Sequence, residues 1–515
     1  MYPAIHARRH PERPAFVMAG SGVATSYREL DECSNRLAHL FRAHGLRQRD
    51  HYCMFMENNE HYIVANAAGE RSDLYYTCIN SFLTAQELGF IVDNSDSKAM
   101  ITSRAKRDVA AQAMVQCAKL RLALIVDGPS DGAFVNLEQG CSAFATTPIA
   151  DEWLGMPMLY SSGTTGRPKG VLWALPNNPP SEPLSLFNFL SKLWRYRENM
   201  VYLSPAPLYH SAPQAAVSLC VRSGGTAIIM ENFGPEQYLA LIEKYRVTHS
   251  QLVPTMFNRL LKLPDAVRQR YDLSSLEVAI HAAAPCPVQI KERMIEWWGP
   301  IVHEYYGATE GLGFTACDSQ EWLAHRGTVG KVMLGDLHIL DEQMRPSAKG
   351  VPGEIWFKTA TPFEYYNDPQ RTAQSRSPDG SMTTVGDVGY VDGDGFLFLT
   401  DRSTFMIISG GVNIYPQECE NLLVTHPGVA DAAVFSVPNE DLGEEVKAIV
   451  QLVPGTEPGP ALEAELMAFC QEHLAKLKCP RSIEFDPALP RLPTGKLYKK
   501  ALRERYWAGR ATRIV

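Results

Sequence analysis

Apolar positions at helical spacing alternate along the chain with short apolar runs. Residues 27–46 carry apolar side chains on one helical face, which predicts a helix that ends near Gly45. Residues 61–70 and 84–93 predict two further helices, and the second has a capping signal because Glu87 follows Thr84 by three residues. Short apolar runs predict strands between and after these helices. They lie at residues 51–56, 74–80, 99–102 and 122–126.

The same alternation returns in the middle of the chain. A strand, a helix and a strand are predicted between residues 226 and 252, with further strands at residues 276–280 and 302–306. Strands that alternate with helices favour a layered α/β domain whose sheet is largely parallel. Residues 185–196 are apolar and aromatic at helical spacing, which favours a core helix over the wall of a substrate site.

The last third of the chain has a different pattern. From residue 327 to 400, glycines interrupt short β segments, which is typical of a small barrel or a distorted sheet. Beyond residue 405, two helical and two extended segments predict a separate α+β domain of about 110 residues. The predicted fold class is therefore α/β. A large N-terminal domain of layered α/β subdomains, with a small β-barrel-like part, precedes a small α+β C-terminal domain.

Composition and charge limit the class of protein. With 515 residues, 45% hydrophobic and 21% charged, the chain has the composition of a globular enzyme. Its net charge of −8 and pI near 6.0 argue against a nucleic-acid partner, which selects a basic surface. No apolar run approaches the roughly 20 residues that span a bilayer, and the first residues lack the apolar core of a secretory signal. Eleven cysteines without a C-x-x-C pair indicate neither a disulfide framework nor a zinc site, so we expect a cytoplasmic location.

The segment YSSGTTGRPKGV, residues 160–171, gathers glycines, hydroxyls and two cations in one short loop after an apolar run. The glycines let the backbone turn tightly and bring its N–H groups close to a ligand, while the hydroxyls and Lys169 add donors and a mobile charge. This combination suits a polyphosphate, although a polar surface turn would have the same composition. It is not a Walker loop, because Gly170 follows the lysine where that loop has Ser or Thr. The candidate phosphate ligands are Ser161, Ser162, Gly163, Thr164, Thr165, Gly166 and Lys169.

Three charged side chains in turns would complete a nucleotide site. Glu310, between glycines, is a candidate Mg²⁺ ligand, because Mg²⁺ takes one or two carboxylates together with phosphate oxygens. Asp387 follows a strand and would accept ribose hydroxyls. Lys496 follows Gly495 on a turn before a basic helix. A solvated Glu, a turn-forming Asp and a solvated basic end remain the alternatives for these three positions.

Six segments in one order resemble the adenylate-forming acyl-CoA synthetase superfamily over residues 10–505. They are YSSGTTGRPKGV, PAPLYHSAP, HEYYGATE, VGDVGYVDGDGFLFLTDR, ISGGVNIYPQECE and PRLPTGKL. The resemblance implies an ATP- and acid-binding domain over residues 1–402, a hinge at residues 403–404, and a mobile C-terminal domain over residues 405–515 that carries a catalytic lysine. It also implies two steps. An acid and ATP give an acyl-adenylate and pyrophosphate, and the thiol of coenzyme A then displaces AMP.

The resemblance also implies residue roles in the first step. Lys496 would bridge carboxylate and phosphate, and Glu310 would hold Mg²⁺. Thr165 would be a further catalytic residue. His210 resembles the residue that gates the carboxylate pocket, and residues 161–169 would cradle the β- and γ-phosphates. Tyr306 resembles the ring that stacks on adenine. The rest of the implied nucleotide site comprises Ala283, Ala284, Pro285, Tyr305, Gly307, Thr309, Asp387 and Arg402, of which the last two resemble the ribose contacts.

In the second step, Ser409, Gly410 and Gly411 would line the tunnel for the pantetheine of coenzyme A. The pivot of the hinge maps to Thr404, where the family usually has Asp or Lys. Val385 and Val412 also depart from the pattern, replacing Thr and either Glu or Ala. None of these departures removes a charge that the chemistry needs.

The acyl pocket is expected between the loops PLYHSAP, VPTMF, HAAAP and YYGATEGLG. These loops contain no Lys or Arg to hold a second carboxylate, so we expect a bulky apolar acid of the fatty, aryl or steroid-like kind. The pocket residues are expected to be His210, Ala212, Ala282, Gly307 and Leu312.

Other functions stay open. The first alternative is an acyl-adenylate ligase that loads a carrier protein, and luciferase-like oxygenation is a more distant one. A nucleotide-binding regulator without turnover belongs to a different class, and the set of Glu310, Asp387, Arg402 and Lys496 speaks against it. The expected partners are ATP, Mg²⁺, coenzyme A and a small carboxylic acid, with no membrane span, and a homodimer stays open.

Overall fold

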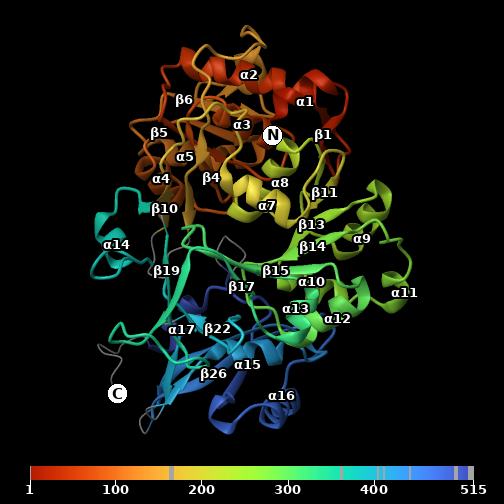
Figure 1. Cartoon of the computed structure of the whole chain (residues 1–515), viewed down its shortest axis with the longest axis vertical. Helices are drawn as coiled ribbons and strands as arrows, with labels where there is room; N and C mark the ends of the chain where they lie inside the picture. Colours follow the sequence, from red (N-terminus) through yellow and green to blue (C-terminus); the bar gives the residue numbers. More distant parts are fainter. Residues whose placement is uncertain are drawn as a thin grey trace. The chain divides into compact units, whose positions relative to one another are not determined.

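The computed structural model describes residues 2–161, 168–359, 363–402, 405–409, 412–439, 442–491 and 497–507. The chain divides into two compact units (Figure 1). The first contains residues 1–252, 262–280 and 363–372, and the second contains residues 253–261, 281–362 and 373–515.

One sheet of the first unit has six parallel strands in the order β7-β6-β5-β3-β4-β8. The strands are β3 (His51–Phe55), β4 (Tyr75–Ile79), β5 (Ser97–Ser103), β6 (Leu122–Val126), β7 (Val135–Asn136) and β8 (Met156–Pro157). Every residue of β3, β4 and β6 is buried, as parallel strands covered on both faces require. The predicted parallel sheet is confirmed here.

The helices that accompany this sheet begin where the sequence has capping residues. They are α2 (Tyr27–Ala43), α3 (His61–Glu70), α4 (Ala85–Asn94), α5 (Arg107–Met114) and α6 (Leu137–Cys141). The predicted capping box at Thr84 and Glu87 is present. Helix α2 also begins with one, because Ser26 and Glu29 exchange hydrogen bonds in the same way. The chain leaves α2 at Gly45, whose φ of +80° favours glycine.

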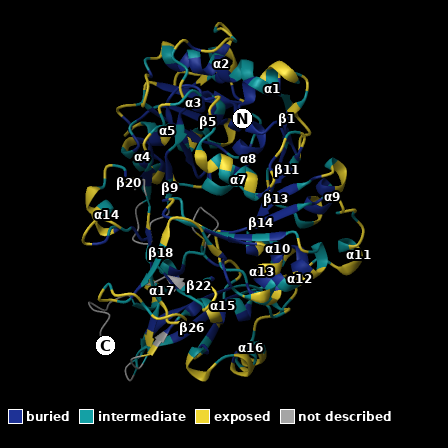
Figure 2. Ribbon diagram, in the orientation of Figure 1, coloured by how far each residue is buried: buried dark blue, intermediate teal, exposed yellow. Residues whose placement is uncertain are grey.

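The second sheet of this unit runs β14-β13-β11-β12-β1-β2, and its β1, β11, β12 and β13 are parallel. The strands are β1 (Pro14–Met18), β2 (Ala24–Ser26), β11 (Val201–Ser204), β12 (Thr226–Ile229), β13 (His249–Leu252) and β14 (Val278–His281). The neighbouring helices are α1 (Pro3–Arg9), α8 (Ser211–Arg222), α9 (Pro235–Tyr245) and α11 (Asp265–Arg268). Figure 2 shows β13 and β14 buried, whereas α9 has exposed residues.

Helix α7 and a small three-stranded sheet of this unit were not predicted correctly from the sequence. Helix α7 (Ser185–Leu193) has no buried residue, so the prediction of a core helix is wrong; Trp194 and Tyr196, just beyond it, are buried. A three-stranded sheet joins β9 (Leu159–Ser161) and β10 (Lys169–Leu172) to β20 (Glu364–Tyr365), which comes from far along the chain. Helix α14 (Pro369–Gln374) follows β20.

The second unit begins with α10 (Pro254–Leu261), α12 (Val288–Trp298) and α13 (Ser319–Ala324), beside the antiparallel strands β15 (Val302–Tyr306), β16 (Phe314–Cys317) and β17 (Lys331–Leu334). A four-stranded antiparallel sheet follows in the order β18-β19-β21-β22. Its strands are β18 (Asp336–Leu340), β19 (Gly353–Lys358), β21 (Asp387–Val391) and β22 (Leu397–Arg402). The predicted change to glycine-punctuated β structure is therefore confirmed.

The C-terminal part of this unit is the predicted α+β structure. Its sheet has the order β24-β23-β26-β25, with β27 parallel to β26. The strands are β23 (Ile407–Ser409), β24 (Val412–Ile414), β25 (Val429–Asn439), β26 (Gly443–Leu452) and β27 (Ser482–Phe485), and the helices are α15 (Pro416–Leu423), α16 (Pro460–His473) and α17 (Lys499–Trp507). Leu422, Val434 and Leu466 belong to the buried core that these elements share.

The mixed α/β fold class, with a large N-terminal and a small C-terminal domain, is confirmed. All eleven cysteines are free thiols. Across the described ranges of the chain, no helix combines the length and the apolar character needed to cross a bilayer.

Candidate functional site

Two paired strands of the first unit flank the predicted phosphate loop. Ser161 ends β9, Lys169 begins β10, and the two residues pair across the antiparallel strands. The ammonium of Lys169 lies 4.7 Å from the ring centroid of Tyr365 in β20. Paired strands therefore anchor both ends of the loop. Its remaining predicted ligands, Ser162, Gly163, Thr164, Thr165 and Gly166, lie outside the described residues.

Gly170 has a different role from the one its place in this loop predicts. A Cβ at Gly170 would lie 3.0 Å from the ring of Tyr160, which leaves little room for any side chain. The Tyr160 hydroxyl donates to Oδ1 of Asn94 at 2.6 Å, so this ring is itself held in place. Close approach to the partly buried ring of Tyr160 explains this glycine.

His210 and Ala212 lie together at the start of α8, beyond the carboxyl end of β11. The N–H of His210 donates to the carbonyl of Pro207 at 3.2 Å, and His210 is the N-cap residue of the helix. Its ring lies 4.6 Å from that of Tyr209. Loops at the carboxyl ends of parallel strands are the usual ligand positions in such sheets, and the gating role of His210 stays a prediction.

In the second unit, the predicted adenine residues follow the ends of β14 and β15. Ala282 is buried after β14, whereas Ala283 and Ala284 are exposed. Ala283 has a φ of +73°, a conformation that L residues rarely adopt and that clusters at ligand sites. Pro285 follows them and is partly buried.

Strand β15 ends on two tyrosines whose rings are both fixed. Tyr305 stacks on Phe314 with the ring centroids 5.0 Å apart. The Tyr306 hydroxyl donates to Oδ2 of Asp387 at 2.8 Å. Asp387 begins β21 and pairs in register with Arg402 of β22, the other predicted ribose contact. The structure thus brings Tyr306, Asp387 and Arg402 to neighbouring positions.

The turn after β15 holds the predicted metal ligand. Gly307 is exposed, Thr309 is partly buried, and the N–H of Gly311 closes the turn on the carbonyl of Ala308 at 2.9 Å. Glu310 is 7% exposed and Leu312 is 3% exposed. One carboxylate in a tight turn fits Mg²⁺ only where phosphate oxygens supply other ligands, as in a complex with ATP. In the described part of the chain, the residues that cluster like metal ligands are His325, Asp392 and Asp394, without Glu310.

The predicted residues of the C-terminal part are only partly described. Ser409 ends β23 and pairs with both Val412 and Gly443. The residues on either side of residues 492–496 are joined, because Arg491 pairs with Leu497 as an isolated antiparallel bridge. The predicted residues Thr404, Gly410, Gly411 and Lys496 lie outside the described residues.

A buried ionic cluster that the sequence motifs did not indicate lies between the end of β14, α12 and β15. The ammonium of Lys291 in α12 lies 2.5 Å from Oε2 of Glu304 in β15, and Nε2 of His281 lies 3.3 Å from the same oxygen. Lys291 and His281 have no exposed surface, and Glu304 is 4% exposed. The signal was available, since helical spacing places Lys291 between Val288 and Met294 on a face that is otherwise apolar.

Burial and charge have opposite effects on this cluster. Burial by itself raises the pKa of Glu304, but the neighbouring His281 and Lys291 outweigh it and lower that pKa to about 2. Burial lowers the pKa of His281 below its ordinary value. The carboxylate is therefore ionised and paired with Lys291, which joins α12 to the strand that ends on Tyr305 and Tyr306.

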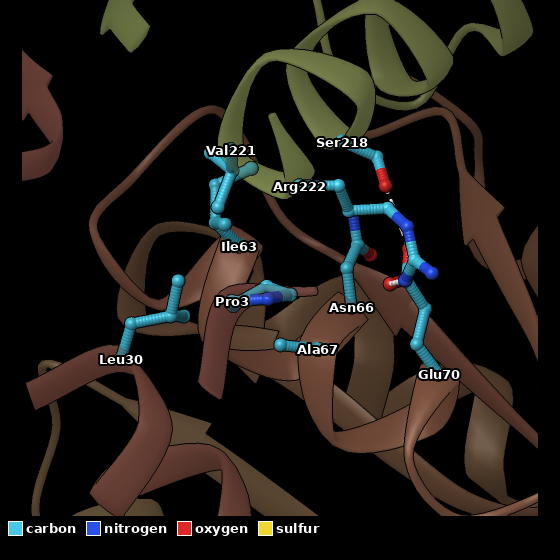
Figure 3. Close-up of a pocket in the computed structure, with 9 residues that line it drawn as sticks. All are labelled: Pro3, Leu30, Ile63, Asn66, Ala67, Glu70, Ser218, Val221 and Arg222. Carbon is cyan, nitrogen blue, oxygen red and sulfur yellow. Dashed lines mark hydrogen bonds and ion pairs between the residues drawn. The ribbon is translucent and has the colours of Figure 1, made fainter. Parts of the chain in front are cut away.

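A small cavity in the first unit lies between α3 and α8 (Figure 3). Its volume of about 20 Å³ is enough for one water molecule. Oε2 of Glu70 accepts from Arg222 at 2.8 Å, and Oε1 accepts from Ser218 at 2.7 Å. Arg222 also donates to the carbonyl of Pro180 at 2.8 Å. No predicted site residue lines this cavity, which is too small for an acyl group.

The chain matches known proteins over nearly its whole length. The AMP-binding enzyme family matches residues 4–367, and the AMP-binding enzyme C-terminal domain matches residues 418–496. A CoA ligase from Rhodococcus jostii, named for a propanoyl group on a methyl-dioxo-octahydroindene ring system, is 30% identical over 95% of both chains.

Two further proteins are similar to this chain over nearly its whole length. The fatty acid–acyl-carrier-protein ligase ScoC from Streptomyces coeruleorubidus is 29% identical over 99% of this chain and 97% of its own. The crystal structure of ATP-bound MatB from Rhodopseudomonas palustris superposes with a TM-score of 0.81 and 28% identity, covering 99% of each chain. The chain therefore belongs to the AMP-binding enzyme family, within the adenylate-forming acyl-CoA synthetase superfamily, and is an enzyme of the acid–thiol ligase class.

Proposed function

We propose that this chain is an ATP-dependent carboxylic acid–CoA ligase that acts on a bulky apolar acid of the fatty, aryl or steroid-like kind. The observation that carries the proposal is the hydrogen bond from the Tyr306 hydroxyl to Asp387, at a position whose backbone pairs with that of Arg402 across β21 and β22. A carboxylate held in this way is suited to accept the two hydroxyls of a ribose. The family match and the CoA ligase of Rhodococcus jostii support the same assignment.

In the first proposed step, a carboxylate oxygen of the acid attacks the α-phosphorus of ATP. A P–O bond to the acid forms, and the P–O bond to pyrophosphate breaks. Both reactants are anions, so fixed positive charge must offset their repulsion as the five-coordinate centre develops. We assign that charge to the ammonium of Lys496, and the contacts to the β- and γ-phosphates to residues 161–169. Glu310 would hold Mg²⁺, which would supply further positive charge beside the phosphate oxygens.

In the second proposed step, the thiol sulfur of coenzyme A attacks the acyl carbon. The C–S bond forms, the C–O bond to AMP breaks, and the thiol proton is released. No acyl-enzyme nucleophile is needed, because the mixed anhydride is already activated. We assign the approach of the thiol to the segment of Ser409, Gly410 and Gly411, where glycines leave room for a narrow ligand.

The proposed class of acid follows from the residues assigned to the acyl pocket. Ala212, Ala282 and Gly307 are small, Leu312 is apolar, and His210 is the gating residue. The four loops assigned to the pocket contain no Lys or Arg that would pair with a second carboxylate. Discrimination among apolar acids of different size amounts to only about 1–3 kcal/mol per methylene, so neighbouring acids are also expected to react.

Purified chain with ATP, Mg²⁺ and coenzyme A tests the proposal. Octanoate, palmitate, cinnamate and cholate sample chain length and ring content, and AMP formation is the readout. We expect acid-dependent AMP formation with at least one of them, and acid-dependent ATP–pyrophosphate exchange without coenzyme A. A chain that binds ATP but shows neither activity with any acid would be a nucleotide binder, contrary to the proposal.

A ligase that loads a carrier protein is the second candidate, favoured by the likeness to ScoC. Both candidates share the exchange reaction, so only the acceptor distinguishes them. If AMP release requires a phosphopantetheinylated carrier protein and ignores coenzyme A, the second candidate replaces the first.

A further inference from the structure

A buried cation lies three residues after the proposed catalytic lysine. Lys499 begins α17, and its ammonium lies 2.7 Å from Oε2 of Glu420 in α15. The side chains of Lys499 and Glu420 are 9% and 7% exposed. Lysine and glutamate are rarely this buried unless they are paired.

Glu420 connects more than two elements. Its Oε1 accepts the backbone N–H of Val434 in β25 at 2.7 Å, while its Oε2 faces Lys499. Each carboxylate oxygen therefore has a donor, as a buried ion pair requires. The same ammonium lies 5.2 Å from the ring centroid of Phe405. Phe405 directly follows the expected hinge at residues 403–404.

The backbone beside Lys499 is also held. Leu497 pairs with Arg491, and the N–H of Tyr498 donates to the carbonyl of Pro490 at 2.7 Å. Leu497 packs against the cluster that contains Phe435 and Leu489. The three residues after Lys496 are thus tied to the rest of the C-terminal part by a backbone bridge, an apolar contact and an ion pair.

Stability alone does not account for the ion pair. Removing two charges from water costs free energy that their attraction often fails to recover, and apolar residues of similar volume would serve stability as well or better. The next residue provides a contrast. Lys500 makes an exposed pair with Glu504 at 3.6 Å, with side chains that are 31% and 60% exposed.

We propose that Lys499 is a positioning residue for adenylation. Its pair with Glu420 holds the base of the segment that carries Lys496, and its contact with Phe405 ties this base to the start of the C-terminal domain. The segment therefore follows any rotation at the hinge as one body. This inference rests on the proposed role of Lys496. Such placement matters because an error of about 1 Å in the position of a reacting group can lower a rate about 100-fold.

Two half-reactions test the proposal, with Lys499→Met as the variant and Lys500→Met as the matched control. The acid that gives the most AMP is used for ATP–pyrophosphate exchange, and its synthetic adenylate with coenzyme A is used for thioester formation. We expect Lys499→Met to lower kcat for exchange by about 30- to 100-fold with a small change in the KM for ATP. Thioester formation from the supplied adenylate and the activity of Lys500→Met are expected to stay near the wild-type values.

A second variant separates positioning from folding. Lys499→Met leaves the Glu420 carboxylate buried without its cation. The double variant with Glu420→Gln removes that charge and keeps an acceptor for the N–H of Val434. We expect the double variant to regain thermal stability but not exchange activity. Exchange that returns together with the melting temperature would show a purely structural role and overturn the proposal.

Amide hydrogen exchange provides a readout that does not depend on the proposed reaction. We expect the amide of Tyr498, which donates to the carbonyl of Pro490, to lose at least about tenfold in protection in Lys499→Met, and to keep it in Lys500→Met. Unchanged protection overturns the positioning role whatever the activity. Lost protection in a chain that performs no adenylation upholds the structural link and rejects the proposed function instead.

Discussion

The hydroxyl of Tyr306 donates to Oδ2 of Asp387 at 2.8 Å, across 81 residues of sequence. This bond joins the end of β15 to the start of β21. It therefore fixes the carboxylate that we propose for the ribose relative to the ring that we propose for adenine.

Replacing Asp387 with Asn is expected to weaken ATP binding. The amide keeps the shape of the side chain but loses its charge and one acceptor, and a hydrogen bond to a charged group contributes about 1.5–3 kcal/mol. We expect the KM for ATP to rise about 10- to 150-fold, as measured by exchange at saturating acid. Tyr306→Phe, which leaves Asp387 in place, is expected to have a smaller effect.

Tyr390→Phe is the control for this pair. Tyr390 is also in β21, where it stacks on Phe398 with centroids 4.9 Å apart, so the variant removes a hydroxyl from the same strand and keeps the ring. Its KM for ATP is expected to stay within about twofold of the wild type. An Asp387→Asn enzyme with an unchanged KM would remove Asp387 from the nucleotide site.

Lys496→Ala is expected to separate the two proposed steps. The ammonium offsets the charge of two anions during adenylation, but nothing in thioester formation requires it. We expect acid-dependent pyrophosphate exchange to fall by at least about 100-fold, because a preorganised charge is lost at the reacting centre. Conversion of supplied acyl-adenylate and coenzyme A to the thioester is expected to continue. Normal exchange in this variant would remove Lys496 from the mechanism.

Local sequence signals are enough to predict where a helix with a capping box begins. Helix α4 begins after Thr84 because the threonine and Glu87 satisfy the free backbone groups of its first turn. The same reasoning applies to Ser26 and Glu29 at α2, although the prediction had relied on apolar spacing alone. A capping box depends on two residues that are three positions apart, so the start of such a helix can be predicted from the sequence alone.

Long-range pairing was beyond such signals. Strand β20 pairs with β10, which lies nearly 200 residues earlier in the chain. Because β20 has only two residues, it is too short to show a periodic pattern that would predict this pairing. Helix α7 has the apolar spacing of a core helix but no buried residue, because spacing shows that a face is apolar and not what covers it. The order of the motifs predicts which residues form the proposed site. It does not predict that the Tyr306 hydroxyl donates to Asp387, which only the structure shows.

The buried cluster at Lys291 is expected to be critical for the stability of the second unit. Lys291→Met removes the cation from a glutamate that is 4% exposed, and a buried charge without its partner costs about 3–5 kcal/mol. Trp322 reports on the site directly, because the Lys291 ammonium lies 4.7 Å from its ring centroid. Urea denaturation followed by tryptophan fluorescence measures the change.

A neighbour on the same helix provides the control for Lys291. Glu292 pairs with Arg326 at the surface, and its side chain is 31% exposed. Glu292→Gln is expected to change the free energy of unfolding by less than about 1 kcal/mol. The double variant Lys291→Met with Glu304→Leu is expected to regain most of the loss. Equal losses for Lys291→Met and Glu292→Gln would contradict the special cost of the buried charge.

His249 makes the stability of the first unit sensitive to acid. The ring has no exposed surface, and Nε2 lies 2.9 Å from the carbonyl of Trp194 while Nδ1 lies 2.8 Å from the hydroxyl of Thr248. A carbonyl oxygen can only accept, so a neutral ring carries its proton on Nε2 and donates it to Trp194. Burial outweighs the hydrogen bond to Trp194 and lowers the pKa of His249 from 6.5 to about 4.

The sign of the effect follows from this lowered pKa. Between pH 6.5 and 4 the unfolded chain binds a proton at this position that the folded chain does not, so stability falls as the pH falls through that window. A difference of this size corresponds to about 3 kcal/mol over the full window, and to about 2 kcal/mol between pH 7.5 and pH 5. His249→Gln keeps a donor and an acceptor but does not titrate. We therefore expect the variant to lose about 2 kcal/mol less than the wild type between these two pH values, as measured by urea denaturation at each. Parallel losses in the two proteins would show that His249 does not contribute to the acid sensitivity.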